Sequence, residues 1–158
     1  MNYLFEFVVS VVSSIGFALI FNSPRKTILI SGLNGGLGWL MYKLLVGQIN
    51  SIYIATFVSS FIIAVTSEIL ARVFHYPASV FIFPGVINLC PGEAIYKSMR
   101  FFIASQNKIA IGFLYRSLAI AGAIAFGVML SSSFSISMKR FKFRSHRRTD
   151  FLRSNDEN

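Results

Sequence analysis

Two Pro-Gly pairs lie seven residues apart in the segment 83–96, inside an apolar run that would otherwise be typical of a membrane helix. Each proline removes one backbone hydrogen bond from a helix. A backbone group left unpaired in hydrocarbon costs several kcal/mol, unless protein or a wet cavity satisfies it. The sequence therefore predicts a span that is broken between Pro84 and Gly92. Broken helices in transporters are where solutes bind.

The composition indicates a membrane protein. Of the 158 residues, 54% are hydrophobic and 13% are charged, and the mean hydropathy is +0.64. A soluble domain carries about 25% charged residues, so this chain lacks the polar surface that it would need in water. The net charge is +9, and seven of the 15 lysines and arginines lie in the C-terminal tail, beyond the last apolar run. That position favours a cytoplasmic membrane flank over nucleic-acid binding.

We predict an all-α integral membrane bundle of about five transmembrane helices, the fourth broken at the Pro-Gly pairs. The expected spans are 3–21, 28–46, 52–74, 78–105 and 109–133. Residues 1–137 form the predicted helical domain, and 138–158 a basic, flexible cytoplasmic tail. Basic loops face the cytoplasm, so four crossings between Arg25-Lys26 and the tail leave the amino terminus outside.

Small residues indicate close helix packing. Gly32 and Gly36 form a GxxxG motif, which lets two helix backbones approach closely in lipid. A dinucleotide-binding loop is the rival interpretation of this glycine cluster. It requires a preceding strand and a later acidic residue, and neither is present. Trp39, Tyr42 and Lys43, which follow, are interpreted as an aromatic belt with a snorkelling lysine at the membrane interface.

Charged residues within the spans are candidates for function, because a charge in hydrocarbon is costly. Glu6 shares a helix face with Ser10 and Ser13, and it either lines the bundle or reaches the interface. The roles of Glu68 and Arg116 stay open.

Glu93, Lys97 and Arg100 share one face after the break. In one interpretation, Glu93 complements the helix start and pairs with Lys97 while Arg100 snorkels. In the other, this face lines a solute path in which the two cations attract a carboxylate. Free N–H groups at the half-helix that starts near Gly92 would hold that carboxylate. Asn88 could bond a hydroxyl or a carboxylate, and Tyr96 could form part of the wall of the site.

Three segments of the chain resemble the threonine/serine exporter family. They are GFALIFNSP at 16–24, the glycine-rich helix ending at Gly38-Trp39, and PGVINLCPGEAIY at 84–96. Two positions depart from the family pattern: Asn88 stands where proline is common, and Glu93 where a small residue is common. The matching motif positions are Gly16, Phe17, Asn22, Pro24, Pro84, Gly85, Pro91, Gly92 and Tyr96.

The resemblance implies a membrane subunit equivalent to the carboxyl-terminal half of fused exporters. Such a subunit works in the bacterial inner membrane with a larger membrane partner, and together they export threonine, serine or related small carboxylates. A membrane enzyme is the least favoured interpretation, because two histidines at a turn and in the tail and a single cysteine give no convincing nucleophile or metal-ligand set. We expect no cofactor, metal or nucleic-acid partner. The alternative is a structural or regulatory membrane subunit without its own solute site. The predicted substrate-binding residues are Pro84, Gly85, Asn88, Pro91, Gly92, Glu93, Tyr96, Lys97 and Arg100.

Overall fold

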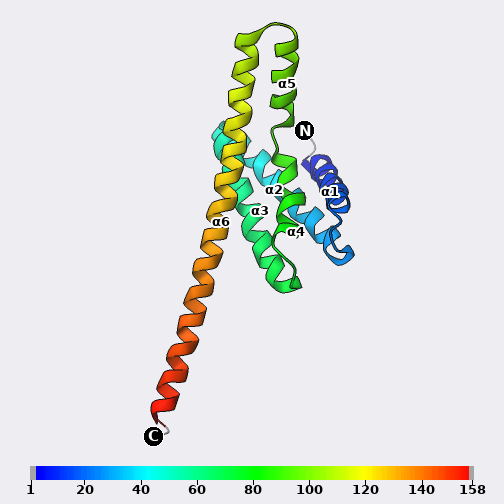
Figure 1. Cartoon of the computed structure of the whole chain (residues 1–158). Coiled ribbons are helices and arrows are strands. Elements are labelled where there is room, and N and C mark those ends of the chain that lie inside the picture. The colour runs from blue at the N-terminus through cyan, green and yellow to red at the C-terminus, as the bar shows by residue number, and fades with distance from the viewer. Residues whose placement is uncertain (1–2, 157–158) are drawn as a thin grey trace.

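The computed structural model describes the backbone of residues 3–156 and the side chains of residues 3–133 (Figure 1). The described chain is helical throughout, which confirms the predicted all-α class. Its elements are α1 (Tyr3–Ile20), α2 (Arg25–Ile49), α3 (Ile52–Phe74), α4 (Ser79–Val86), the 3-10 turn η1 (Ile87–Leu89), α5 (Gly92–Ile103) and α6 (Asn107–Asp156).

The candidate membrane spans agree with the predicted bundle. Helices α1, α2 and α3 and the first 27 residues of α6 are long and apolar enough to cross a membrane. The segments Ser79–Leu89 and Gly92–Ile103 form a fifth candidate together, and they meet at an angle of 51°. The fourth element is therefore a bent pair, as the sequence predicts.

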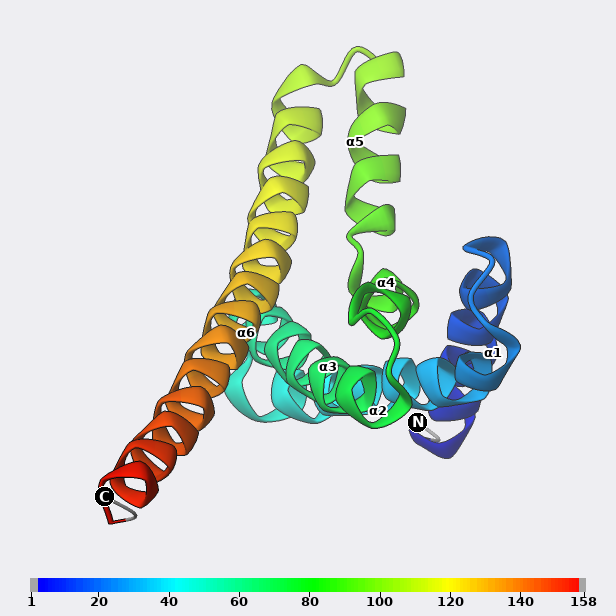
Figure 2. The ribbon, with the colours of Figure 1, turned by 60° about the horizontal axis from the view of Figure 1, so that its bottom comes forward.

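Helix α2 lies at the centre of the bundle, where α1, α3 and α4 pack against it. Helix α5 packs against the start of α6, and the two form a hairpin that projects from one end of the molecule (Figures 1 and 2). The middle of α6 packs on α3, and its C-terminal part extends beyond the other end. The backbone stays helical through the basic segment to Asp156, while the side chains of that segment lie outside the described residues. The division at residues 137 and 138 stays a prediction.

Helix ends explain part of the 16–24 motif. Asn22 adopts a left-handed conformation with φ of 52°, and the amide of Ser23 donates to the carbonyl of Ala18. This is a Schellman ending, which satisfies carbonyls that the last turn of α1 leaves unpaired. Pro24 then precedes α2, and its carbonyl accepts hydrogen bonds from both the amide and the hydroxyl of Thr27.

The span breaks only at the second Pro-Gly pair. Pro84 lies inside α4, and the chain leaves helical geometry at Cys90–Pro91, after η1. Proline at position 84 frees the carbonyl of Val80, four residues earlier. The hydroxyl of Ser31 on α2 donates to that carbonyl at 3.3 Å. The expectation that each pair interrupts the helix therefore holds at the second pair and is wrong at the first.

Glycines on α2 allow close packing on two sides. A Cβ at Gly32 or Gly36 would collide with side chains of α1, so the predicted GxxxG faces α1. A Cβ at Gly35 would overlap the hydroxyl of Ser14 and lie 3.2 Å from the Cα of Gly85. The first Pro-Gly pair is thus a packing element, with Gly85 set against the α2 backbone.

Candidate solute cavity at the helix break

A cavity of about 220 Å³ lies beside the break in the span. Its walls come from α2, α3, the break itself, α5 and α6. Trp39 and Tyr42 line it from α2, and Thr56 lines it from α3. Cys90 and Pro91 at the break complete this part of the wall. Elements distant in the sequence therefore converge on the point where the helix is interrupted.

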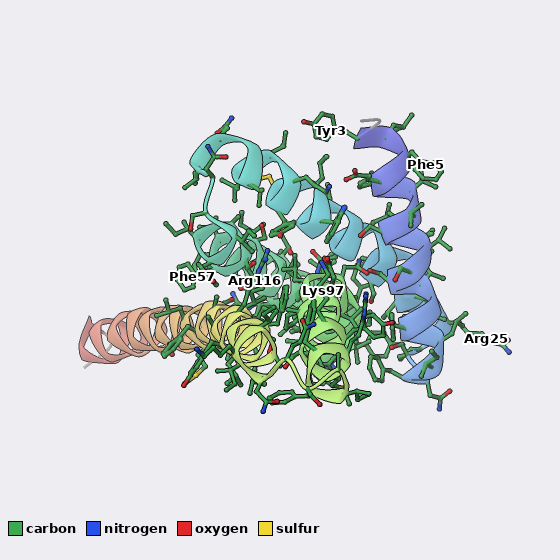
Figure 3. All side chains as sticks on the ribbon, turned by 90° about the horizontal axis from the view of Figure 1, so that it is seen from above. Tyr3, Phe5, Arg25, Phe57, Lys97 and Arg116 are labelled. Carbon is green, nitrogen blue, oxygen red and sulfur yellow. The ribbon has the colours of Figure 1, made fainter. Side chains whose placement is uncertain are left out.

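Two cations face this cavity from the α5–α6 hairpin. Lys97 on α5 and Arg116 on α6 both line it, and Figure 3 shows their side chains on the same side of the hairpin, toward α2. Lys97 pairs with Glu93 at 2.5 Å and lies 5.6 Å from the centre of the Phe113 ring. Within the described side chains, Arg116 has neither an ion pair nor a hydrogen bond. Its guanidinium is free to receive an anion.

The amino-terminal end of α5 adds unpaired donors to the same cavity. The amide of Gly92 donates to Cys90 and that of Ile95 donates to Pro91. In the described chain, the intervening amides of Glu93 and Ala94 have no backbone acceptor, and both residues line the cavity. No side chain caps this helix start. Free N–H groups at a helix start favour an anion.

Asn88 connects the cavity to α1. Its Nδ2 donates to the carbonyl of Ser10 at 3.1 Å and to the hydroxyls of Ser10 and Ser14 at 2.7 and 2.8 Å. A backbone carbonyl can only accept, so these contacts fix which end of the amide faces α1. In the described chain, the Oδ1 of Asn88 has no protein partner. It remains available to a solute hydroxyl or ammonium.

The other predicted site residues are not part of the cavity lining. Pro84 and Gly85 are buried where α4 packs on α2 and α3. Gly92 begins α5 with open space where a Cβ would be. Tyr96 is 65% exposed, and Arg100 lies 5.8 Å from the Phe101 ring. Of the nine predicted residues, the cavity lining includes Asn88, Pro91, Glu93 and Lys97.

Sequence reasoning missed the wall that α2 contributes. Trp39 and Tyr42 were interpreted as an interfacial belt, but they line the cavity and their rings lie 5.3 Å apart. The glycine spacing could have predicted this wall. Trp39 and Tyr42 follow Gly35 and Gly38 by one helical turn, so all four residues share one face of the helix. Lys43, interpreted as snorkelling, instead lies 3.1 and 3.2 Å from the two carboxylate oxygens of Glu6.

The described residues contain no group of three or more His, Cys, Asp or Glu side chains that could hold a metal ion. The chemistry of the cavity rests on hydrogen bonds and charge. Its charged groups are two cations and one carboxylate, and its uncharged polar groups include two free amides, the Oδ1 of Asn88 and the hydroxyls of Tyr42 and Thr56.

Comparison with known proteins gives one family. Residues 6–134 match the family described as "Threonine/Serine exporter, ThrE". A threonine/serine exporter of Corynebacterium glutamicum is 26% identical over 129 residues, covering 82% of this chain and 26% of the relative. An uncharacterized protein of Haemophilus influenzae is 27% identical over 139 residues, covering 82% of this chain and 46% of the relative. The chain thus spans a quarter to a half of the length of these relatives. No solved structure matches it.

Proposed function

Because the chain belongs to the threonine/serine exporter family, we propose that the cavity at the helix break holds the exported solute. This is a family of transporters and not of enzymes. The solute we propose is threonine, serine or a related small carboxylate. One observation carries the proposal: the unpaired guanidinium of Arg116 lies on the same cavity as the free amides at the start of α5.

The groups on the cavity wall suit a zwitterion. The carboxylate of an amino acid would rest on the free amides of Glu93 and Ala94 and on Arg116, since each is a donor to an anion. Its ammonium would take Glu93 as partner. The Oδ1 of Asn88 would accept from a side-chain hydroxyl. A hydroxyl donor matched to an acceptor discriminates threonine and serine from apolar amino acids of similar size.

We further propose that a larger membrane subunit covers the open side of this cavity. The side chain of Glu93 is 81% exposed and that of Lys97 is 40% exposed, on a helix that belongs to a candidate span. Lipid would be a costly neighbour for this pair, because charges in hydrocarbon are expensive. Water or a second protein must therefore face them. The additional length of the relatives favours protein.

The test is export by cells that carry the chain and its proposed partner subunit. Arg116→Gln should weaken apparent solute affinity by about tenfold to a hundredfold, the range for a lost charged hydrogen bond. Lys97→Gln should weaken it less, because Lys97 is paired with Glu93 and acts on the solute carboxylate through its charge alone. Arg100→Gln is the matched control, because Arg100 lies on the same helix as Lys97 but outside the cavity lining. Cells that carry the Arg100→Gln variant should export the solute at the wild-type level.

Membrane levels of all three variants should be equal by immunoblot. Unchanged export in Arg116→Gln and Lys97→Gln would contradict the proposed site. It would favour a structural or regulatory subunit without its own solute site.

A further inference from the structure

A second cavity of about 240 Å³ lies between α1 and the other side of the break. Trp39 and Asn88 line both this cavity and the first. Glu6, Ser10 and Ser13 line the second cavity from α1. The two cavities are therefore neighbours, and the shared side chains of Trp39 and Asn88 form the partition between them.

The chemistry of the second cavity is opposite to that of the first. Its lining includes the carboxylate of Glu6, and it includes no cation. Serine hydroxyls of α1 and the face of the Trp39 ring add further electron-rich groups. Such a set attracts a cation, and an aromatic ring stabilises an ammonium placed over its face.

One ammonium group is already held at this wall. The Nζ of Lys43 lies 3.1 Å from the Oε2 of Glu6 and 5.7 Å from the centre of the Trp39 ring. The pair is only partly exposed, with 26% of the Lys43 side chain and 23% of the Glu6 side chain accessible. The geometry that binds the ammonium of a side chain also suits the ammonium of a free amino acid.

We propose that the second cavity is a second solute site on the same path, which recognises the ammonium group of the solute after it passes between Trp39 and Asn88. This inference rests on the proposed function of the first cavity. Lys43 occupies the ammonium position when the site is empty, and the solute displaces it from Glu6. Asn88 is bonded to Ser10 and Ser14 of α1, so movement of α1 sets the width of the partition.

The single cysteine of the chain makes the two cavities separately measurable. Cys90 lines the first cavity, so the wild-type thiol reports on that site. In a Cys90→Ser, Ser13→Cys variant, the thiol at position 13 reports on the second cavity. The experiment measures the rate of N-ethylmaleimide labelling in membrane vesicles that contain the full chain and its proposed partner subunit. The probes are L-serine and glycerate, which has a hydroxyl in place of the ammonium.

We expect L-serine to slow labelling at both positions, by about tenfold at ten times its Kd, since the rate follows the unoccupied fraction. Glycerate should slow labelling of Cys90 and leave the thiol at position 13 unprotected. Glu6→Gln should abolish protection at position 13 while Cys90 stays protected. Protection of Cys90 in Glu6→Gln also shows that this variant is folded. Lys43→Gln should lower the L-serine concentration needed at position 13, because the competing ammonium is gone.

The outcomes separate this inference from the function on which it rests. If L-serine protects Cys90 but not position 13, the second site is wrong and the first stands. If glycerate protects position 13 as well as L-serine does, ammonium recognition is wrong. If L-serine protects neither thiol, the proposed function of the first cavity fails, and the second site fails with it.

Discussion

Ser31 compensates for the hydrogen bond that Pro84 removes from α4. The hydroxyl of Ser31 is fully buried, and it donates to the Val80 carbonyl, the acceptor that an amide at position 84 would otherwise use. In a membrane, each such carbonyl needs a partner from the protein. This pairing lets a proline remain in a helix that stays continuous to Val86.

A double-mutant cycle tests this pairing. Ser31→Ala should lower the free energy of unfolding by about 1 kcal/mol, the usual net value of one hydrogen bond. In a Pro84→Ala background, the amide at position 84 satisfies Val80, so the same Ser31→Ala change should cost close to nothing. The measurement is unfolding in detergent micelles. An equal cost of Ser31→Ala in both backgrounds would refute the pairing.

At the level of single residues, the sequence predicted the chemical groups at the site better than it predicted their contacts. It marked Asn88 as a departure that adds an amide near the break, and Asn88 does line the cavity there. It did not reveal that this amide is bonded to Ser10 and Ser14, because those residues lie 78 and 74 positions away. Such contacts depend on how α1 packs, and spacing within one helix carries no information about that. The sequence also identified Arg116, as a charged residue within a span, but gave it no role.

Among the elements, α2 positions the site because its glycines face two directions. Gly32 and Gly36 meet α1 alone, whereas Gly35 lies between Ser14 of α1 and Gly85 of α4, and Gly38 meets Ile63 of α3. The second face continues to Trp39 and Tyr42 on the cavity wall. Close approach at Gly35 therefore sets how deeply the broken span sits against α2. The GxxxG pattern predicted the first face, and only the fold shows the second.

We expect Gly35→Ala to destabilise the bundle by about 1–3 kcal/mol, the usual cost of overpacking. Its Cβ would overlap the Ser14 hydroxyl, which also accepts a hydrogen bond from Asn88. Gly122→Ala is the control, since nothing lies within 4 Å of a Cβ there. Alanine is the better helix former, so this control should be neutral or stabilising by up to about 1 kcal/mol. Thermal unfolding in detergent measures the stability of both variants. If Gly35→Ala were as stable as Gly122→Ala, α2 and α4 would tolerate separation.

For the whole molecule, the bent pair has two possible arrangements: it crosses the membrane or it turns back within it. Helix α5 has 12 residues, which is about 18 Å and too short for a hydrocarbon core of about 30 Å. Together with α4 and η1, α5 is long enough to reach the far side of the membrane. The sequence predicted five crossings from its basic loops. In the described residues, helix length and hydropathy allow four crossings, or five if the bent pair is one span.

Charge favours the crossing. Arg25 and Lys26 begin α2, and a tail rich in lysine and arginine follows residue 138. Basic segments stay on the cytoplasmic side. Four crossings between the two segments, through α2, α3, the bent pair and α6, place both there. A re-entrant pair gives three crossings and exports one of the basic segments.

We therefore expect the loop between α5 and α6 to lie outside and the carboxyl terminus inside. Alkaline phosphatase fused after Gln106 should be active, and green fluorescent protein fused after Asn158 should fluoresce, because each reporter works on one side only. Fusions after Lys26 are the control, since the start of α2 is cytoplasmic in both topologies. Phosphatase that is inactive after Gln106 and active after Asn158 would make the bent pair re-entrant. The cavity at its break would then open to one side of the membrane only, and the solute would need the partner subunit for its remaining path.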